Sequence, residues 1–246
     1  MLDKPRAWLL THDTDEAEPR AQAAYFALAE RRLAGEPVAY LVGEREFMGH
    51  MFRVTPDVLI PRPDTELLAE TAIALLAGRQ GARALDLGTG SGAIAVSIAL
   101  ACPHVEVGAT DRSADALAVA ADNARRLGAK VHCWQGDWYE ALPEGERFDV
   151  IVSNPPYIAR DDAHLGQGDL RFEPRGALTD GGNGLADLAS IVAGAGKRLN
   201  PGGALWLEHG WEQAEIVRDM LAQAGFAGVN SHKDLAGIER ISGGNL

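Results

Sequence analysis

Short apolar runs alternate with amphipathic segments over the last two thirds of the chain. The apolar runs are rich in Val, Ile, Leu and Ala, have the length of buried strands, and lie at 83–87, 105–110, 130–134, 147–153 and 204–208. The segments between and after them have helical periodicity, at 93–101, at 113–127, at 185–199, and from the last strand to about 224. This alternation predicts an α/β fold with a parallel sheet covered by helices on both faces. In such sheets, ligands bind beyond the C-terminal ends of the strands.

The first sixty residues have a different pattern. Residues 19–34 place Phe26 and several alanines on one helical face and charged residues on the other. From 39 to 60, short β-like pieces are broken by glycines and a proline, which predicts a β-hairpin linker. The pattern therefore divides the chain into a small helical N-terminal domain (1–38), the β-hairpin linker (39–60) and the α/β domain (61–246).

Composition and charge exclude several classes of protein. The 246 residues carry a formal net charge of −12, which disfavours a partner held by its phosphates, so no direct contact with nucleic acid is expected. No apolar run approaches the roughly 18 residues of a membrane span, and the charged start lacks the pattern of a secretory signal. The two cysteines lack a metal-binding spacing and the seven histidines are scattered, so no metal site is expected. We expect a cytoplasmic monomer.

The run of small residues after the first predicted strand indicates a cofactor loop. It is Gly88-Thr89-Gly90-Ser91-Gly92 and leads into a helix, whose N-terminus presents free backbone N–H groups to a ligand. Asp111 ends the second strand, where its carboxylate can accept hydrogen bonds from ribose hydroxyls. The spacing fits both the G-x-G-x-x-G/A pattern of dinucleotide enzymes and the G-x-G-x-G pattern of S-adenosylmethionine (SAM) enzymes, so the loop alone leaves both open.

The four residues Asn154-Pro155-Pro156-Tyr157 follow the fourth predicted strand. The two prolines have no N–H and stop both helix and sheet pairing, which leaves a rigid corner. The Asn154 amide, the backbone carbonyls and the ring of Tyr157 can accept both hydrogens of a planar NH2 group and stack on its plane. Such a clamp directs the nitrogen lone pair at an electrophile, which is catalysis by orientation. A proline-rich loop that merely ends a strand is the alternative.

Trp138 follows the third predicted strand, where an adenine ring would lie on such a sheet. Its indole can stack on adenine, and the alternative is an aromatic side chain of the core. A nicotinamide enzyme has no use for a clamp on an NH2 group, whereas a methyl donor opposite the clamp gives it a role. The combination therefore favours SAM over a dinucleotide.

These motifs resemble those of a known family, the protein-(glutamine-N5) methyltransferases (PrmC/HemK) that modify peptide-chain release factors. The resemblance runs from about Glu36 onward and includes three further segments, Ile60-Pro61-Arg62-Pro63-Asp64-Thr65-Glu66, Glu173-Pro174-Arg175 and Asp234-Leu235-Ala236-Gly237. The glycine loop and Asp111 are shared with many SAM enzymes. The Asn-Pro-Pro-Tyr corner narrows the field to methylation of planar nitrogens, and the first of the three segments is the family's own.

The resemblance implies a Rossmann-like class I SAM-dependent methyltransferase sheet. It implies transfer of a methyl group from SAM to the amide N5 of the glutamine in the Gly-Gly-Gln loop of a release factor, with S-adenosylhomocysteine as product. SAM would contact residues 88–92, Asp111, Trp138 and Asn154, and residues 154–157 would hold the glutamine and carry the catalysis. Family members begin with about one more pair of helices before Lys4, so the N-terminal domain is expected to be shortened.

Two other functions share part of this pattern. A nucleic-acid methyltransferase acting on adenine-N6 or guanine-N2 would use the same corner on a flipped base, but the acidic balance opposes it. A non-catalytic SAM-binding module would require a degraded corner, and this corner is intact. The pattern assigns no role to His209, or to Arg160, Arg171 and Arg175 on the long loop that follows the corner.

Overall fold

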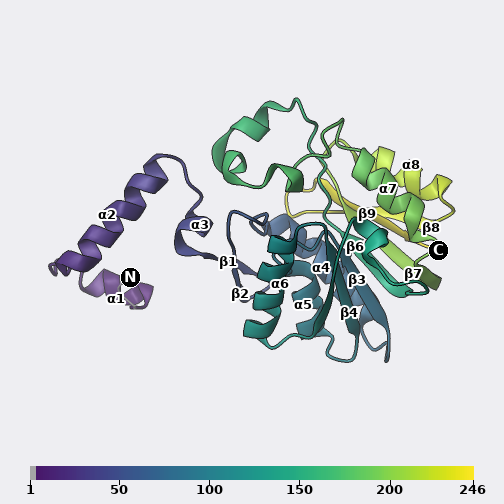
Figure 1. Cartoon of the computed structure of the whole chain (residues 1–246), viewed down its shortest axis with the longest axis horizontal. Coiled ribbons are helices and arrows are strands. Elements are labelled where there is room, and N and C mark those ends of the chain that lie inside the picture. Colours follow the sequence, from purple (N-terminus) through teal and green to yellow (C-terminus); the bar gives the residue numbers. More distant parts are fainter. Residues whose placement is uncertain (1–3) are drawn as a thin grey trace.

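The computed structural model describes residues 4–246, so the first three residues of the predicted N-terminal domain lie outside the described residues. Its centre is a seven-stranded sheet in the order β5-β4-β3-β6-β7-β9-β8 (Figure 1). The strands are β3 (Arg83–Leu87), β4 (Glu106–Asp111), β5 (Val131–Gln135), β6 (Phe148–Ser153), β7 (Leu199–Glu208), β8 (Ala227–Lys233) and β9 (Glu239–Asn245).

Strands β3 to β7 are parallel to one another, as the alternation predicts. Strand β9 is antiparallel to both of its neighbours, β7 and β8, which the sequence pattern did not predict. Gly243 of β9 lies opposite Trp206 of β7, and a Cβ at this glycine would come within 2.2 Å of the Trp206 ring. A glycine that looks like part of a turn is therefore required here by close packing inside the sheet.

Helices cover both faces of the sheet (Figure 1). Three of them, α4 (Pro63–Leu76), α5 (Ala93–Ala101) and α6 (Ala114–Leu127), share one core, and α7 (Ala186–Ala195) and α8 (Ala214–Gln223) share the other. Side chains of one strand alternate between the two cores: Val150 and Val152 of β6 pack with α4 and α5, whereas Ile151 packs with α7 and α8. The predicted three-layer arrangement is confirmed.

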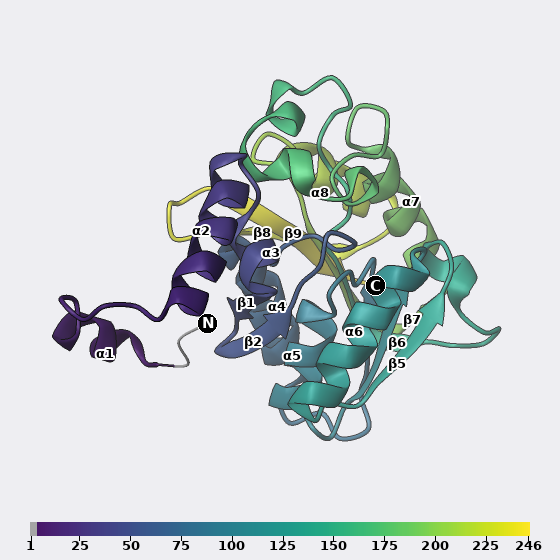
Figure 2. The ribbon, with the colours of Figure 1, turned by 60° about the vertical axis from the view of Figure 1, so that its left-hand side comes forward.

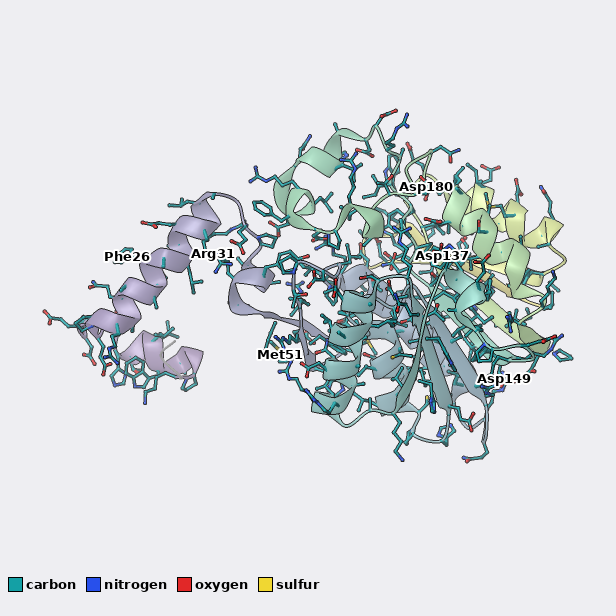
Figure 3. All side chains as sticks on the ribbon, in the orientation of Figure 1. Phe26, Arg31, Met51, Asp137, Asp149 and Asp180 are labelled. Atoms are coloured by element: carbon teal, nitrogen blue, oxygen red, sulfur yellow. The ribbon has the colours of Figure 1, made fainter. Side chains whose placement is uncertain are left out.

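The N-terminal helices project from one side of this body (Figures 1 and 2). They are α1 (Arg6–Thr11) and α2 (Pro19–Leu33), and no residue of α2 is buried. Phe26, labelled in Figure 3, is 55% exposed and Leu33 is 87% exposed. The helix predicted at 19–34 is present, but its apolar face covers no core. An ion pair of 3.2 Å between Arg32 and Asp169 joins α2 to the long loop after β6.

The segment predicted as a hairpin linker contains both a helix and a hairpin. Helix α3 (Val38–Val42) comes first, and strands β1 (Glu44–Phe47) and β2 (His50–Arg53) form the antiparallel pair. The run Val-Ala-Tyr-Leu-Val resembles a strand, yet Pro37 precedes it and Gly43 ends it at a φ of 78°, which together define one helical turn. The division of the chain into three domains stays a prediction.

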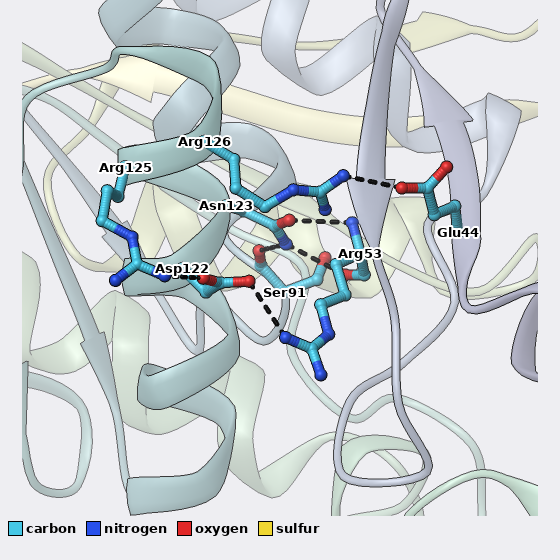
Figure 4. A network of polar contacts seen from close by, with 7 residues as sticks. All are labelled: Glu44, Arg53, Ser91, Asp122, Asn123, Arg125 and Arg126. Atoms are coloured by element: carbon cyan, nitrogen blue, oxygen red, sulfur yellow. Dashed lines mark hydrogen bonds and ion pairs between the residues drawn. The ribbon is translucent and has the colours of Figure 1, made fainter.

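One buried asparagine fastens the hairpin to the main domain (Figure 4). Asn123 of α6 accepts a hydrogen bond from the backbone N–H of Arg53 at 2.8 Å and donates to the Arg53 carbonyl at 2.9 Å. Its Nδ2 also donates to the carbonyl of Ser91 in the glycine loop at 2.9 Å. The fully buried side chain therefore holds the linker hairpin and the glycine loop in one frame.

Replacing Asn123 by alanine is expected to destabilise the protein by about 2–4 kcal/mol, because three hydrogen bonds are lost and buried groups are left unpaired. Urea unfolding would measure this change. The matched control is Arg125→Ala on the same helix: this side chain is 80% exposed and pairs with Asp122, so its removal should cost less than about 1 kcal/mol. Equal stability of the Asn123 variant and the control would contradict the role of Asn123 in holding the hairpin and the glycine loop together.

Candidate functional site

A cavity of about 280 Å³ lies where β3, β4, β5 and β6 end. This is the edge at which ligands of parallel sheets bind. Most of the predicted site residues line this cavity, namely Gly88, Thr89, Gly90, Ser91, Asp111, Trp138, Asn154 and Pro156. The structure thus brings the glycine loop and the Asn-Pro-Pro-Tyr corner, more than sixty residues apart in the sequence, to one cavity.

The remaining predicted site residues do not line the cavity. Gly92 has a φ of 80°, and a Cβ there would lie 3.0 Å from the Ala120 side chain, so this glycine lets α5 and α6 pack closely. Pro155, within the corner, is buried, and Tyr157 is half-buried beside the α7–α8 core. The Tyr157 hydroxyl donates to Oε1 of Glu208 at 3.2 Å, and its carbonyl accepts from Gln213 at 3.0 Å.

Asp111 shapes the glycine loop from the end of β4. Its Oδ2 accepts from the backbone N–H of Gly90 and its Oδ1 from that of Ser113, both at 2.9 Å. Each carboxylate oxygen keeps a lone pair for another donor. Gly88 has a φ of 70°, and a Cβ there would lie 3.1 Å from the Trp138 ring. The indole of Trp138 therefore packs against Gly88 of the loop, and Trp138 also lines the cavity.

Two walls of the cavity were not predicted. One is the end of the linker, where Asp57, Val58 and Leu59 lead into Pro61 and Arg62. The other is formed by Pro174, Gly176 and Ala177 of the long loop, which carries three short 3₁₀ turns between Ala163 and Ala177. The two walls are joined by an ion pair of 2.6 Å between Arg62 and the buried Glu173. Part of each wall, Pro61 with Arg62 in one and Pro174 in the other, lies in a segment singled out only for its resemblance to the family.

Several residues without an assigned role lie away from the cavity. His209 is fully buried, and its ring nitrogens lie 2.8 Å from Ser242 Oγ and 2.9 Å from the Gly210 carbonyl. Arg160, Arg171 and Arg175 are exposed on the long loop. Within residues 4–246, no three His, Cys, Asp or Glu side chains are grouped to hold a metal ion, and no helix is long and apolar enough to cross a membrane.

A second carboxylate beneath the loop is strongly affected by burial. Asp86 of β3 is 1% exposed, and burial raises its pKa to about 7 from an ordinary value of 3.8. Hydrogen bonds from the Thr89 hydroxyl at 2.7 Å and the Ala95 N–H at 3.2 Å act in the opposite direction on this pKa. Because the folded protein holds this proton more tightly than the unfolded chain, the group stabilises the fold at low pH, and that stability is lost as pH rises from about 4 through 7.

The variant Asp86→Asn is therefore expected to unfold at a higher temperature than the wild type at pH 8, and at a similar temperature at pH 4. The difference at pH 8 is at most on the order of 4 kcal/mol, since three pKa units correspond to about that free energy. Thermal unfolding followed by circular dichroism across this range would measure it. Asp219→Asn, an exposed carboxylate on α8, is the control and should leave the pH dependence unchanged. A parallel pH dependence of Asp86→Asn and wild type would contradict the prediction.

Family models match two parts of the chain. The family model "Methyltransferase small domain" matches residues 63–183, and "PrmC N-terminal domain" matches residues 1–43. The release factor glutamine methyltransferase of Bordetella pertussis is 69% identical over 246 residues, which cover 100% of this chain and 91% of that relative. The protein of the same name in Burkholderia pseudomallei is 57% identical, over 98% of this chain and 87% of its own length. The chain belongs to the release factor glutamine methyltransferase family.

As a member of this family the chain is a SAM-dependent methyltransferase, and the predicted fold class is confirmed. A 16S rRNA methyltransferase of T. thermophilus, solved with AdoMet and guanosine, has a TM-score of 0.62 at 23% identity, over 82% of this chain and 49% of that chain. A methyltransferase of Pyrococcus furiosus has a TM-score of 0.59 at 22% identity, over 88% of this chain and 96% of that chain. At these identities the likeness concerns the fold alone.

Proposed function

We propose that this methyltransferase transfers the methyl group of SAM to the side-chain amide N5 of the glutamine in the Gly-Gly-Gln loop of a peptide-chain release factor. The observation that carries the proposal is that Asn154 and Pro156 line the same cavity as the glycine loop and Asp111. A methyl donor on the loop and an amide on the corner would therefore meet in one cavity. Membership of the family supports a release factor as the acceptor.

The residues of the cavity suit SAM. Asp111 keeps lone pairs for ribose hydroxyls, and the ring of Trp138 offers a flat face for adenine beside Gly88. The backbone of the loop reaches the cavity because its glycines carry no side chain. When bound, SAM supplies an electron-poor methyl carbon. Asn154, which also lines the cavity, would lie between the cofactor and the acceptor.

The residues of the corner would act by orientation. Oδ1 of Asn154 would accept one N–H of the glutamine amide, and a backbone carbonyl of the corner would accept the other. Both N–H groups are then held, and the nitrogen lone pair is directed at the methyl carbon. The step forms the N–C bond and breaks the S–C bond, and the methylated amide nitrogen releases its proton to water. In this scheme no side chain acts as a general base.

The amide clamp touches only a few atoms, so selectivity has to come from remote docking of the folded release factor. We propose the long loop at 158–183 and the helix α2 around Phe26 as the docking surfaces. They adjoin each other, since Arg32 of α2 pairs with Asp169 of the loop and the guanidinium of Arg171 lies 3.4 Å from the Ala34 carbonyl. The proposal includes action in the cytoplasm as a monomer, without direct contact to nucleic acid.

The deciding experiment incubates the enzyme and labelled SAM with three acceptors: an intact release factor, the same factor with glutamine replaced by alanine in its Gly-Gly-Gln loop, and ribosomal RNA. Label is expected in the intact release factor alone. Label in the RNA would favour the exocyclic-amine methyltransferase instead. A fourth acceptor, a short Gly-Gly-Gln peptide, tests docking, because equal kcat/KM for the peptide and the intact factor would rule out remote contacts.

A further inference from the structure

Behind the corner lies a buried carboxylate that the scheme above does not use. Glu208 ends β7 and is 2% exposed. Its Oε1 accepts a hydrogen bond from the Tyr157 hydroxyl at 3.2 Å, and its Oε2 is buried without a partner that has hydrogen-bond geometry. A buried carboxylate that is incompletely paired does not stabilise a fold. Its contact with Tyr157 of the corner points to a role in the site.

Thr65 connects this carboxylate to the corner. The Nδ2 of Asn154 lies 3.2 Å from the Thr65 hydroxyl oxygen and donates to it. Thr65 is 5% exposed, so its own hydroxyl proton needs an acceptor inside the protein. Helix α4, which carries Thr65, packs on β7, which carries Glu208, and the Thr65 hydroxyl lowers the pKa of that carboxyl, while Oε2 has no hydrogen-bond partner. A rotation of the Thr65 side chain that lets its hydroxyl donate to Oε2 would complete the chain from Asn154 through Thr65 to Glu208.

The direction of these bonds follows from chemistry. An ionised carboxylate accepts and never donates, so Thr65 and Tyr157 both have to donate to Glu208. A threonine hydroxyl has one proton, and once Thr65 gives it to Glu208, its oxygen can only accept from Asn154. The NH2 group of Asn154 is then fixed toward Thr65, which leaves Oδ1 for the cavity. The reverse rotation would present an NH2 group to the NH2 group of a substrate amide, and two donors repel.

We propose that Glu208 is a positioning residue, which acts through Thr65 to fix the rotation of the Asn154 amide so that its oxygen faces the acceptor nitrogen. The inference rests on the proposed function, since it assumes an amide acceptor at the corner. It explains why Thr65 is placed in the cavity wall at the start of α4.

The charges around Glu208 do not provide it with an ion partner. Asp64 of α4 carries the same charge, and Arg240 of β9 is already paired with Asp234 at 2.9 Å and Asp64 at 3.5 Å. His209, the next residue, is turned to Ser242 and the Gly210 carbonyl. Burial raises the pKa of Glu208 to about 7, so the test is made at pH 8, on the carboxylate side of that value.

The test compares Glu208→Gln with the wild type at pH 8. Glutamine keeps the shape but can donate to Thr65, which can then donate to Oδ1 of Asn154 and turn the amide over. We expect kcat on a release factor to fall on the order of 10- to 100-fold, with KM and the affinity for SAM little changed. Unfolding at pH 8 should not be easier, because the substitution removes a buried charge. Glu215→Gln, exposed on α8, is the matched control and should match the wild type.

Two variants of Thr65 separate positioning from packing. Thr65→Val keeps the shape without the hydroxyl, and its kcat should fall as that of Glu208→Gln does. Thr65→Ser keeps the hydroxyl and should retain most of the wild-type kcat. Full activity of both Glu208→Gln and Thr65→Val would overturn the inference. A lowered unfolding temperature of Glu208→Gln together with lost SAM binding would also overturn it, in favour of a structural role.

One readout does not depend on activity. In NMR spectra of the wild type, the side-chain amide protons of Asn154 should show a nuclear Overhauser effect to the Thr65 methyl group, and this effect should be lost or weakened in Glu208→Gln. An unchanged effect in the variant would overturn the positioning role even if the enzyme methylates release factors. If the wild type fails to methylate release factors, the proposed function fails, and the NMR comparison still decides how Asn154 is held.

Discussion

Replacing Asn154 by alanine is expected to lower kcat by about 10²-fold or more while the protein stays folded. The side chain supplies the oriented oxygen of the clamp, and removal of one such oriented hydrogen-bonding group typically has an effect of this size. Its loss should change stability little, because one hydrogen bond to Thr65 at 3.2 Å contributes about 1 kcal/mol. Single-turnover rates with a release factor at saturating SAM would measure the effect on chemistry.

The variant Asn154→Asp serves as the isosteric control. It keeps an acceptor oxygen in the cavity, but it cannot donate to Thr65, and it adds a negative charge. An intermediate loss of turnover is expected, together with folding like that of the wild type. An alanine variant with undiminished kcat would remove Asn154 from the chemistry and leave only the proline corner to hold the substrate.

Replacing Asp111 by alanine is expected to weaken SAM binding roughly ten- to a hundredfold. Hydrogen bonds to a charged group contribute about 1.5–3 kcal/mol, which corresponds to that range of dissociation constants. The structure adds a second reason, since the Asp111 carboxylate also holds the N–H groups of Gly90 and Ser113. Isothermal titration calorimetry with SAM would measure the loss.

The conservative variant Asp111→Asn separates the two contributions. Its single amide oxygen can hold either Gly90 or Ser113, so part of the loop geometry and part of the affinity should survive. An alanine variant that binds SAM as tightly as the wild type, with an unchanged circular dichroism spectrum, would exclude Asp111 from the cofactor site.

The elements of the main domain could be predicted because their apolar patterns are local. The apolar run at 147–153 is the buried strand β6, and Ser113 caps α6 by accepting a hydrogen bond from the Ala116 N–H at 3.1 Å. The antiparallel direction of β9 was not predicted, because a local pattern does not show which distant strand, here β7, a strand pairs with. The apolar face of α2 was predicted from periodicity, but periodicity does not show what packs against such a face, and no residue of α2 is buried.

The site could be predicted in part for the same reason. The glycine loop and Asn154 directly follow a strand and Asp111 ends one, so strand prediction alone brings them to one edge of the sheet. Thr65 and Glu208 lie 143 positions apart in the sequence and meet only through the tertiary fold, so no local pattern marks them as partners (208 − 65 = 143). Gly92 matched the motif, yet its neighbour Ala120 belongs to another helix.

The position of β9 affects the order in which the sheet can be built during synthesis. Strand β8 precedes β9 along the chain, yet its place at the edge of the sheet depends on pairing with β9, which in turn pairs with β7. When β8 leaves the ribosome, β9 has not yet followed, so the position beside β7 is still empty and β7 has an open edge. A chain that stops before Glu239 would therefore lack two sheet positions rather than one. It would expose the edge of β7 to pairing with other chains, which is a route to aggregation.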